Sequence, residues 1–198
     1  MRTAVMGAGS WGTVFSMILA DAGCDVTLWA RSQAIADEVN RQRTNRTYTD
    51  DVELPMAIQA TSDPVAAMAG ADVVVLAMPA QRLRENLGMW AADVPSDAVV
   101  VSLMKGVEHG STKRMSQVIA DVAGVSAQRI AVVSGPNLAH EIASRQPAAT
   151  TVACIEEESA RRLQDACTTV YFRPYYTTDV VGVEIAGALK NVIALANG

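Results

Sequence analysis

The segment Thr3–Thr13 constrains the fold of this chain most strongly. A short apolar run there meets three glycines, Gly7, Gly9 and Gly12, in the spacing Gly-x-Gly-x-x-Gly, and a helical pattern follows over residues 10–22. In a strand–turn–helix unit, the first glycine allows the tight turn, the second lets the backbone approach a pyrophosphate, and the third lets the helix pack closely. Free N–H groups and the helix dipole then attract the phosphates. The segment therefore predicts a dinucleotide-binding loop.

Two other interpretations of this segment are possible. One is a glycine-rich turn between a core strand and a core helix. The other is a signal peptide or membrane span, because residues 3–20 carry no charge and follow Arg2. Each interior glycine costs a helix about 1 kcal/mol relative to alanine, and the unbroken apolar part is too short to span a bilayer. We therefore expect no membrane span.

The composition indicates a globular protein. The chain has 198 residues, of which half are apolar and 19% charged, as expected for one domain with a sizeable core. The net charge of −5 without a long basic run argues against nucleic acid or an anionic membrane as the main partner.

Cys24, Cys154 and Cys167 show no ligand spacing, which predicts buried free thiols in a reducing cytoplasm. His109 and His140 are isolated, so we expect no metal site.

Strand and helix patterns alternate along the chain, which predicts an α/β fold with a doubly wound, Rossmann-type sheet. Residues 71–78 form a continuous aliphatic run that is typical of a parallel strand buried on both faces. Asp63 and Pro64 form an N-cap and first-turn proline for a short helix. Besides the run from Thr3, strands are predicted at 25–29, 58–61, 71–78, 98–103, 130–134, 149–155 and 170–173, and helices at 10–22, 33–41, 64–69, 81–92, 113–123, 156–167 and 179–198.

Basic residues follow two of these strands. Arg31 occupies the position where NAD sites carry an acidic residue and NADP sites an arginine, which favours NADP, with NAD as the alternative. Lys105 lies at a strand's carboxyl end, where a lysine can bind an anionic or hydroxylated substrate; the alternative is a surface lysine. The turn over residues 134–139 contains Gly135 and Pro136 and presents N–H groups before another helix.

The last predicted helix, residues 179–198, is mostly apolar, with Asp179 as its N-cap. We expect it to be buried and to present a narrow polar arc to another group; an exposed polar face is the alternative. Because the chain stops at Gly198, we expect a truncated protein or an obligate partner. At 100° per residue, one arc of about 140° holds Glu184, Gly187, Lys190, Asn191 and Asn197.

Four motifs together make the sequence similar to the bacterial-type NAD(P)-dependent glycerol-3-phosphate dehydrogenases. The match runs from end to end, and the last two motifs are the more specific ones. They are the segments at residues 7–13 (GAGSWGT), 105–108 (KGVE), 134–141 (SGPNLAHE) and 181–192 (VGVEIAGALKNV).

The resemblance implies roles for individual residues. Lys190 is implied to be the proton donor and acceptor. The implied cofactor contacts, besides Gly7, Gly9 and Gly12, are Ser10, Trp11, Arg31, Ser32, Tyr48, Lys105 and Ala139, and the implied substrate contacts are Lys105, Gly135 and Asn137. The chain departs from the family where Asn137-Leu138 replaces Ser or Thr with Phe, and where Tyr48-Thr49-Asp50 replaces Tyr-Leu-Pro.

The implied reaction interconverts dihydroxyacetone phosphate and sn-glycerol 3-phosphate with NAD(P)H and feeds phospholipid synthesis. Residues 1–178 would form the dinucleotide-binding domain, and residues 179–198 would begin a helical substrate domain whose remainder is absent, so we expect this chain to be catalytically incomplete. The alternatives are a related β-hydroxyacid-type dehydrogenase and an NADP-binding module without turnover. The expected partner is a phosphorylated small molecule. Association of two copies into a homodimer is a further possibility.

Overall fold

The computed structural model describes residues 1–197, apart from the side chain of Asn191, so the predicted position of that side chain on the polar arc lies outside the described residues. The strands are β1 (Arg2–Met6), β2 (Asp25–Trp29), β3 (Ile58–Thr61), β4 (Val73–Leu76), β5 (Val99–Ser102), β6 (Ile130–Ser134), β7 (Ala148–Cys154) and β8 (Phe172–Thr177). The helices are α1 (Ser10–Asp21), α2 (Gln33–Gln42), α3 (Arg46–Thr49), α4 (Pro64–Met68), α5 (Leu83–Trp90), α6 (Met115–Ala123), α7 (Ala139–Ala143), α8 (Glu157–Cys167) and α9 (Val180–Asn197), with 3-10 turns η1 (Ala80–Arg82), η2 (Ala91–Asp93) and η3 (Ala127–Arg129).

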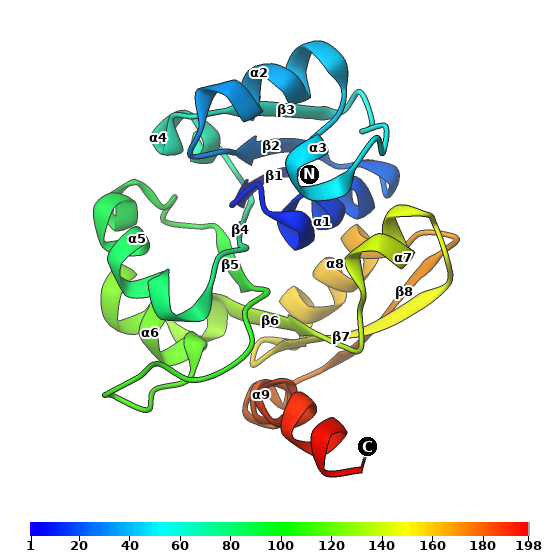
Figure 1. Ribbon diagram of the computed structural model, residues 1–198. Coiled ribbons are helices and arrows are strands. Elements are labelled where there is room, and N and C mark those ends of the chain that lie inside the picture. The colour runs from blue at the N-terminus through cyan, green and yellow to red at the C-terminus, as the bar shows by residue number, and fades with distance from the viewer. Residues whose placement is uncertain (198) are drawn as a thin grey trace.

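All the strands join one eight-stranded sheet in the order β3-β2-β1-β4-β5-β6-β7-β8 (Figure 1). The first six strands of this order are parallel to one another. The order 3-2-1-4-5-6 is that of the Rossmann fold, in which ligands bind at the carboxyl ends of the strands where the strand order reverses. The predicted fold class is therefore confirmed, and the reversal lies between β1 and β4.

Helices cover both faces of the sheet. Alternate residues of a strand point to opposite faces. In β1, Val5 belongs to the buried cluster that includes residues of α1, α2 and α8, while Ala4 and Met6 belong to the cluster that includes residues of α4, α5 and α6. All three residues are fully buried. Cys24, Cys154 and Cys167 are buried free thiols, as predicted.

Strand β7 departs from the regular alternation because it runs antiparallel to β6. A parallel neighbour would require a crossover long enough to carry the chain back along the whole sheet. The connection from β6 to β7 contains only α7, a helix of five residues, so the chain turns at the carboxyl edge and runs back. Strand β8 is parallel to β7 and is covered by α8.

Several boundaries differ from the prediction. Asp63 does cap α4, accepting from the backbone N–H groups of Val65 and Ala66. The helix expected over 81–92 is instead η1, α5 and η2 in succession, and α3 forms in a stretch for which no element is predicted. None of the helices within residues 1–197 combines the length and apolarity that a bilayer crossing requires.

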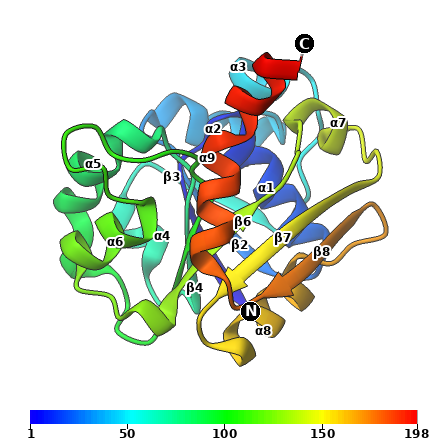
Figure 2. The same ribbon diagram turned by 90° about the horizontal axis from the view of Figure 1, so that it is seen from below.

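Helix α9 lies on the sheet face that α6 covers and crosses β6 and β7 (Figure 2). Its polar residue Glu184 faces the domain and is buried, whereas the large apolar side chains that point away from the sheet are exposed, from Ile185 at 40% to Leu195 at 84%. The expectation that the polar arc contacts another group is confirmed for Glu184, but the predicted burial of the helix is wrong. Only one side of α9 packs on the sheet, and no other element within the described residues covers the opposite side.

Candidate functional site

Each glycine of the loop between β1 and α1 meets different surroundings. Gly7 has a φ of +134°, and a Cβ atom there would lie 2.2 Å from the carbonyl oxygen of Ala77. A Cβ on Gly12 would lie 1.9 Å from the carbonyl oxygen of Gly7, so this glycine allows the helix to pack on the turn. A Cβ on Gly9 would meet no atom within 4 Å. The fold thus requires glycine at 7 and 12 and leaves open space at 9.

The first turn of α1 offers backbone donors to that open space. Gly9 is the N-cap, so no side chain caps the helix, and the first turn contains no acidic residue. Ser10 is exposed and Trp11 is partly buried. Uncapped N–H groups at a helix start bind phosphate readily. These residues fit a dinucleotide diphosphate.

Asn45 supports the glycine-rich loop through hydrogen bonds, a role that the sequence does not indicate. It is fully buried, and its side-chain amide donates to the carbonyl oxygen of Ala8 at 3.0 Å and to the hydroxyl of Thr13 at 2.8 Å. Its backbone carbonyl oxygen accepts from the backbone N–H groups of Tyr48 and Thr49. Asn45 therefore ties the glycine-rich loop to α3, which carries Tyr48.

The implied cofactor contacts Arg31, Ser32 and Tyr48 lie at the same edge of the sheet. Met6 pairs with Trp29 in neighbouring parallel strands, so β1 and β2 end side by side. Arg31 and Ser32 follow β2, and both are exposed. Tyr48 is 46% exposed on α3. Their exposure leaves these side chains accessible to a ligand at this edge.

Lys105 follows β5 and points toward the loop after β6. Its Nζ donates a hydrogen bond of 2.7 Å to the carbonyl oxygen of Gly135. Burial lowers the pKa of Lys105, and the positive charge of Lys190 lowers the pKa further. The structure therefore brings together two lysines that lie 85 positions apart in the sequence.

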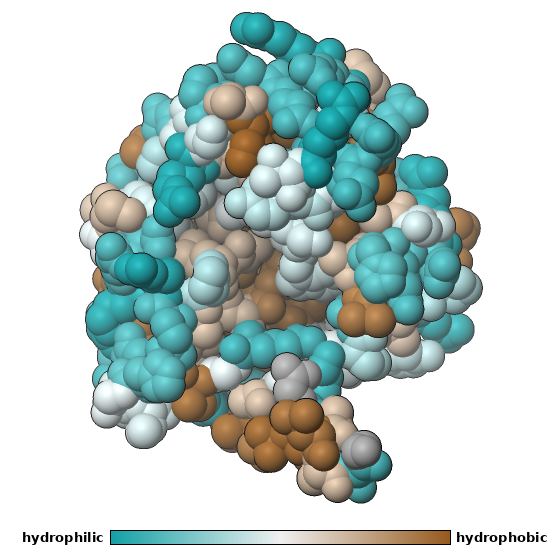
Figure 3. Space-filling model, viewed as in Figure 1, coloured by the Kyte–Doolittle hydropathy of each residue, from teal (hydrophilic) through white to brown (hydrophobic). Residues whose placement is uncertain are grey.

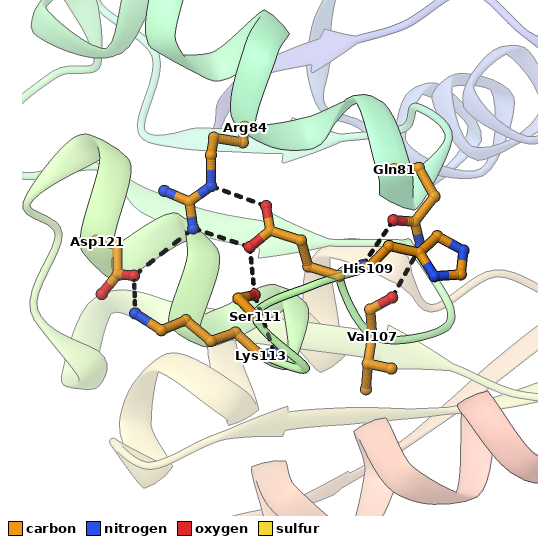
Figure 4. A network of polar contacts seen from close by, with 8 residues as sticks. Gln81, Arg84, Val107, His109, Ser111, Lys113 and Asp121 are labelled. Atoms are coloured by element: carbon orange, nitrogen blue, oxygen red, sulfur yellow. Dashed lines mark hydrogen bonds and ion pairs between the residues drawn. The ribbon is translucent and has the colours of Figure 1, made fainter.

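A network of polar contacts braces the loop after Lys105 (Figure 4). The side chain of Gln81 donates to the carbonyl oxygen of Val107 at 2.8 Å and accepts from the backbone N–H of His109 at 2.9 Å. Arg84 donates two hydrogen bonds to Glu108, at 2.8 and 3.0 Å. These bonds lower the pKa of Glu108 to about 2, with the Ser111 hydroxyl contributing next. This network, with Glu108 ionised, fastens the loop after Lys105 to η1 and α5.

The network continues to α6 through an acidic residue. Asp121 forms an ion pair with Lys113 and lies 3.7 Å from the guanidinium of Arg84. Lys113 lowers the pKa of Asp121, chiefly through its hydrogen bond. The loop from 105 to 114 is therefore held at both ends.

Gly135 and Asn137 lie in the turn after β6. A Cβ on Gly135 would lie 2.9 Å from both the Asn137 Oδ1 and the Thr150 hydroxyl, so the turn requires glycine there. The Asn137 side-chain nitrogen donates to the carbonyl oxygen of Ala149 at 2.8 Å. Asn137 thus braces the turn against β7, which the sequence did not indicate.

Two adjacent cavities join these residues. The first, about 210 Å³, and the second, about 250 Å³, share Ser134 and Gly135 as lining residues. Figure 3 shows this side of the molecule hollowed above α9. The first cavity is also lined by Trp11, Leu103, Lys105, Val133 and Asn137, and the second by Pro136, Thr151, Val183, Ala186, Gly187 and Lys190.

Close contact between α9 and β6 closes one side of the second cavity. A Cβ on Gly187 would lie 2.6 Å from the Ser134 hydroxyl oxygen and 3.7 Å from Cγ of Lys105. Lys190 follows three residues later and lines the cavity. Ala139 begins α7 and packs partly buried against the core near α1. The predicted site residues thus gather along the carboxyl edge of the sheet, from α3 to α9.

Comparison with known proteins gives a consistent result. Residues 2–160 match the family model described as NAD-dependent glycerol-3-phosphate dehydrogenase N-terminus. The whole chain is 61% identical to glycerol-3-phosphate dehydrogenase (NAD(P)+) of Streptomyces avermitilis and 56% identical to the enzyme of the same name from Corynebacterium diphtheriae. It spans 59% and 60% of their lengths, or about three fifths.

A solved structure shows the same fold. The crystal structure of glycerol-3-phosphate dehydrogenase from Coxiella burnetii superimposes with a TM-score of 0.89 at 29% sequence identity, over 98% of this chain and 59% of that one. The chain belongs to the NAD-dependent glycerol-3-phosphate dehydrogenase family.

Proposed function

We propose that this chain supplies the dinucleotide-binding part and the acid–base lysine of an enzyme that interconverts dihydroxyacetone phosphate and sn-glycerol 3-phosphate with NAD(P)H. The observation that carries the proposal is the meeting of Lys105 and Lys190 beside cavities that reach the glycine-rich loop. Family membership supports the substrate. In the same proposal, residues 1–178 bind the dinucleotide and residues 179–198 begin the substrate domain.

The chain's own residues would divide the work in the following way. Backbone N–H groups at Ser10 and Trp11 hold the diphosphate, and the exposed Arg31 donates hydrogen bonds to a 2′-phosphate, which favours NADP over NAD. Ser32, Tyr48 and Ala139 contribute further cofactor contacts. When bound, the nicotinamide supplies or accepts the hydride at the carbon of the substrate carbonyl.

The substrate end depends on the lysines and the turn after β6. Lys105, oriented by the Gly135 carbonyl, attracts the anionic substrate together with Gly135 and Asn137. The Nζ of Lys190 donates a proton to the substrate oxygen as the carbonyl is reduced and removes that proton in the reverse direction. General acid–base catalysis of this kind contributes about 10²–10⁴-fold to the rate.

The test is substitution of Lys190 in the whole protein that carries this chain. Lys190→Met removes the proton donor, and Lys190→Arg keeps the charge but cannot release a proton at neutral pH. Both variants should lose at least about 10²-fold in kcat and should keep NADPH affinity. Near-normal turnover by Lys190→Arg would remove Lys190 from the mechanism.

Substrate comparison separates the proposal from its alternatives. Dihydroxyacetone phosphate should be reduced much faster than dihydroxyacetone or an unphosphorylated 2-keto acid. Preference for an unphosphorylated acid would indicate a related β-hydroxyacid-type dehydrogenase. NADPH binding without turnover by the whole protein would indicate a binding module.

The buried free cysteines support a cytoplasmic location, where thiols stay reduced, and cell fractionation tests this part of the proposal. The exposed apolar side of α9 supports a homodimer. Sedimentation velocity would report that state as a doubling of the mass.

A further inference from the structure

Helix α9 carries one buried charge within the part of the chain that the structure describes. Glu184 is only 7% exposed, although Ile185 and Leu189 beside it are 40% and 46% exposed. Its carboxylate accepts hydrogen bonds from the backbone N–H of Ser116 at 2.8 Å and from the Ser116 hydroxyl at 2.6 Å. The guanidinium of Arg114 completes the set with an ion pair. Three donors from the start of α6 thus satisfy one carboxylate of α9.

These contacts meet a need of α6 itself. Helix N-termini leave N–H groups without acceptors, and an acidic side chain commonly satisfies them. Arg114 occupies the N-cap position of α6 with extended backbone, and its side chain has no oxygen to accept. Glu184 reaches the second residue of the helix from another element, where the helix dipole also favours a negative charge.

The position of Glu184 on α9 links this contact to the candidate site. Gly187 follows one turn later and touches Ser134, and Lys190 follows another turn later and lines the cavity. At about 1.5 Å per residue, Glu184 and Lys190 lie about 9 Å apart along one helix. Rotation of α9 about its axis therefore moves Lys190 whenever it breaks the contact of Glu184.

The apolar contacts under α9 constrain that rotation only loosely. The buried apolar cluster under α9 contains Val180 from the helix and Val132 and Ala153 from the sheet, with Val183 partly buried against them. Apolar contacts are not directional, whereas three hydrogen bonds to one carboxylate define an orientation. Burying an ion pair is also a poor route to stability compared with apolar packing, so orientation accounts better for its presence.

We propose that Glu184 is a positioning residue, whose clamp on the start of α6 sets the rotation of α9 that places Lys190 beside Lys105. The catalytic consequence rests on the proposed function, but the placement itself does not. Loss of the clamp should separate the two lysines while the glycine-rich loop, on the other part of the sheet, stays intact.

The direct test is an NMR titration of the Lys105 ammonium group in this chain. Lys190→Met defines the rise in the pKa of Lys105 when the neighbouring charge is removed. Glu184→Gln, which loses the ion pair with Arg114, should produce a rise in the same direction. Adding Lys190→Met to Glu184→Gln should then raise the pKa little further. An unchanged pKa of Lys105 in Glu184→Gln, or full additivity of the two substitutions, would overturn the proposal.

Two further variants keep the test decisive. Ser116→Ala removes only the hydroxyl donor and should give a smaller rise, which covers the case in which Glu184→Gln does not fold. Glu158→Gln changes an exposed carboxylate on α8 and should leave the pKa of Lys105 unchanged. NADPH affinity of Glu184→Gln should equal that of the unsubstituted chain; a parallel loss of affinity would indicate a general structural role and contradict the proposal.

Turnover in the whole protein supplies a second readout. Glu184→Gln should lower kcat by about 10²-fold, the cost of displacing a catalytic group by about 1 Å, and leave KM for NADPH unchanged. If Lys190→Met itself keeps turnover, the proposed function fails, while the titration still decides whether Glu184 positions Lys190.

Discussion

Gly187 on α9 and Ser134 at the end of β6 approach so closely that a Cβ on the glycine would lie 2.6 Å from the serine hydroxyl oxygen. The next nearest atom, Cβ of Ser134, would lie at 3.6 Å, an ordinary contact distance. The hydroxyl group is therefore the one group that crowds a side chain at 187. This pair sets how closely α9 approaches the cavity that Lys190 lines.

This contact predicts strong coupling between two substitutions. Alanine at an interior helix position is favoured over glycine by about 1 kcal/mol, but Gly187→Ala should lose that gain to the clash. In a Ser134→Ala background the gain should reappear as slower hydrogen exchange of the α9 amides. The double-mutant cycle should give about 1 kcal/mol of coupling; a coupling near zero would contradict the close approach.

Asn45 should prove essential for the dinucleotide loop. Asn45→Ala removes two hydrogen bonds and leaves a buried carbonyl oxygen of Ala8 without a donor, which should cost about 2–4 kcal/mol of unfolding free energy. NADPH affinity, measured by calorimetry, should fall as well, because the loop loses its support. Asn40→Ala is the matched control, since Asn40 also makes two hydrogen bonds, both to Ala60. Equal losses of affinity in both variants would deny Asn45 a specific role.

The sequence predicted the fold well because the relevant signals are local. The continuous aliphatic runs at β4 and β5 and the cap at Asp63 each depend on neighbouring residues only. The direction of β7 could not be predicted, because it depends on how far the five residues of α7 can carry the chain.

The site could be predicted only where residues follow a glycine pattern or end a strand. Asn45 lies in a polar stretch without periodicity, so nothing nearby distinguishes it from a surface residue. The contact between Glu184 and Ser116 spans 68 positions, and the sequence shows only that Glu184 is polar. Likewise, the apolar character of α9 does not reveal which side packs on the sheet.

Low pH should weaken the hydrogen bonds between Arg84 and Glu108 that hold the loop after Lys105. The pKa of Glu108 is lowered from 4.5 to about 2, chiefly by its hydrogen bonds with Arg84. A lowered carboxyl pKa in the folded state adds stability that is fully present above about pH 4.5 and is lost as the pH falls toward 2. The difference in melting temperature between the unsubstituted chain and Glu108→Gln should therefore shrink from pH 6 to pH 3, about one unit above that pKa. A difference in melting temperature that stays constant over this pH interval would show that the hydrogen bonds from Arg84 do not keep Glu108 ionised.

Arg31 should set the preference between the two coenzymes. A hydrogen bond to a charged group contributes about 1.5–3 kcal/mol, and an exposed arginine should lie at the lower end. Arg31→Ala should therefore weaken NADPH binding about tenfold and leave NADH binding nearly unchanged. Arg41→Ala, another exposed arginine at the end of α2, is the control and should alter neither affinity. Equal losses for NADPH and NADH in Arg31→Ala would remove Arg31 from the 2′-phosphate site.

Gly9 offers the most direct test of dinucleotide binding, because the protein itself leaves space for a side chain at this position. Isothermal titration calorimetry of this chain with NADPH should show binding, and Gly9→Val should abolish it while changing the unfolding free energy by no more than about 1 kcal/mol. Unchanged NADPH binding by a folded Gly9→Val, or no binding of either coenzyme by the unsubstituted chain, would contradict the account.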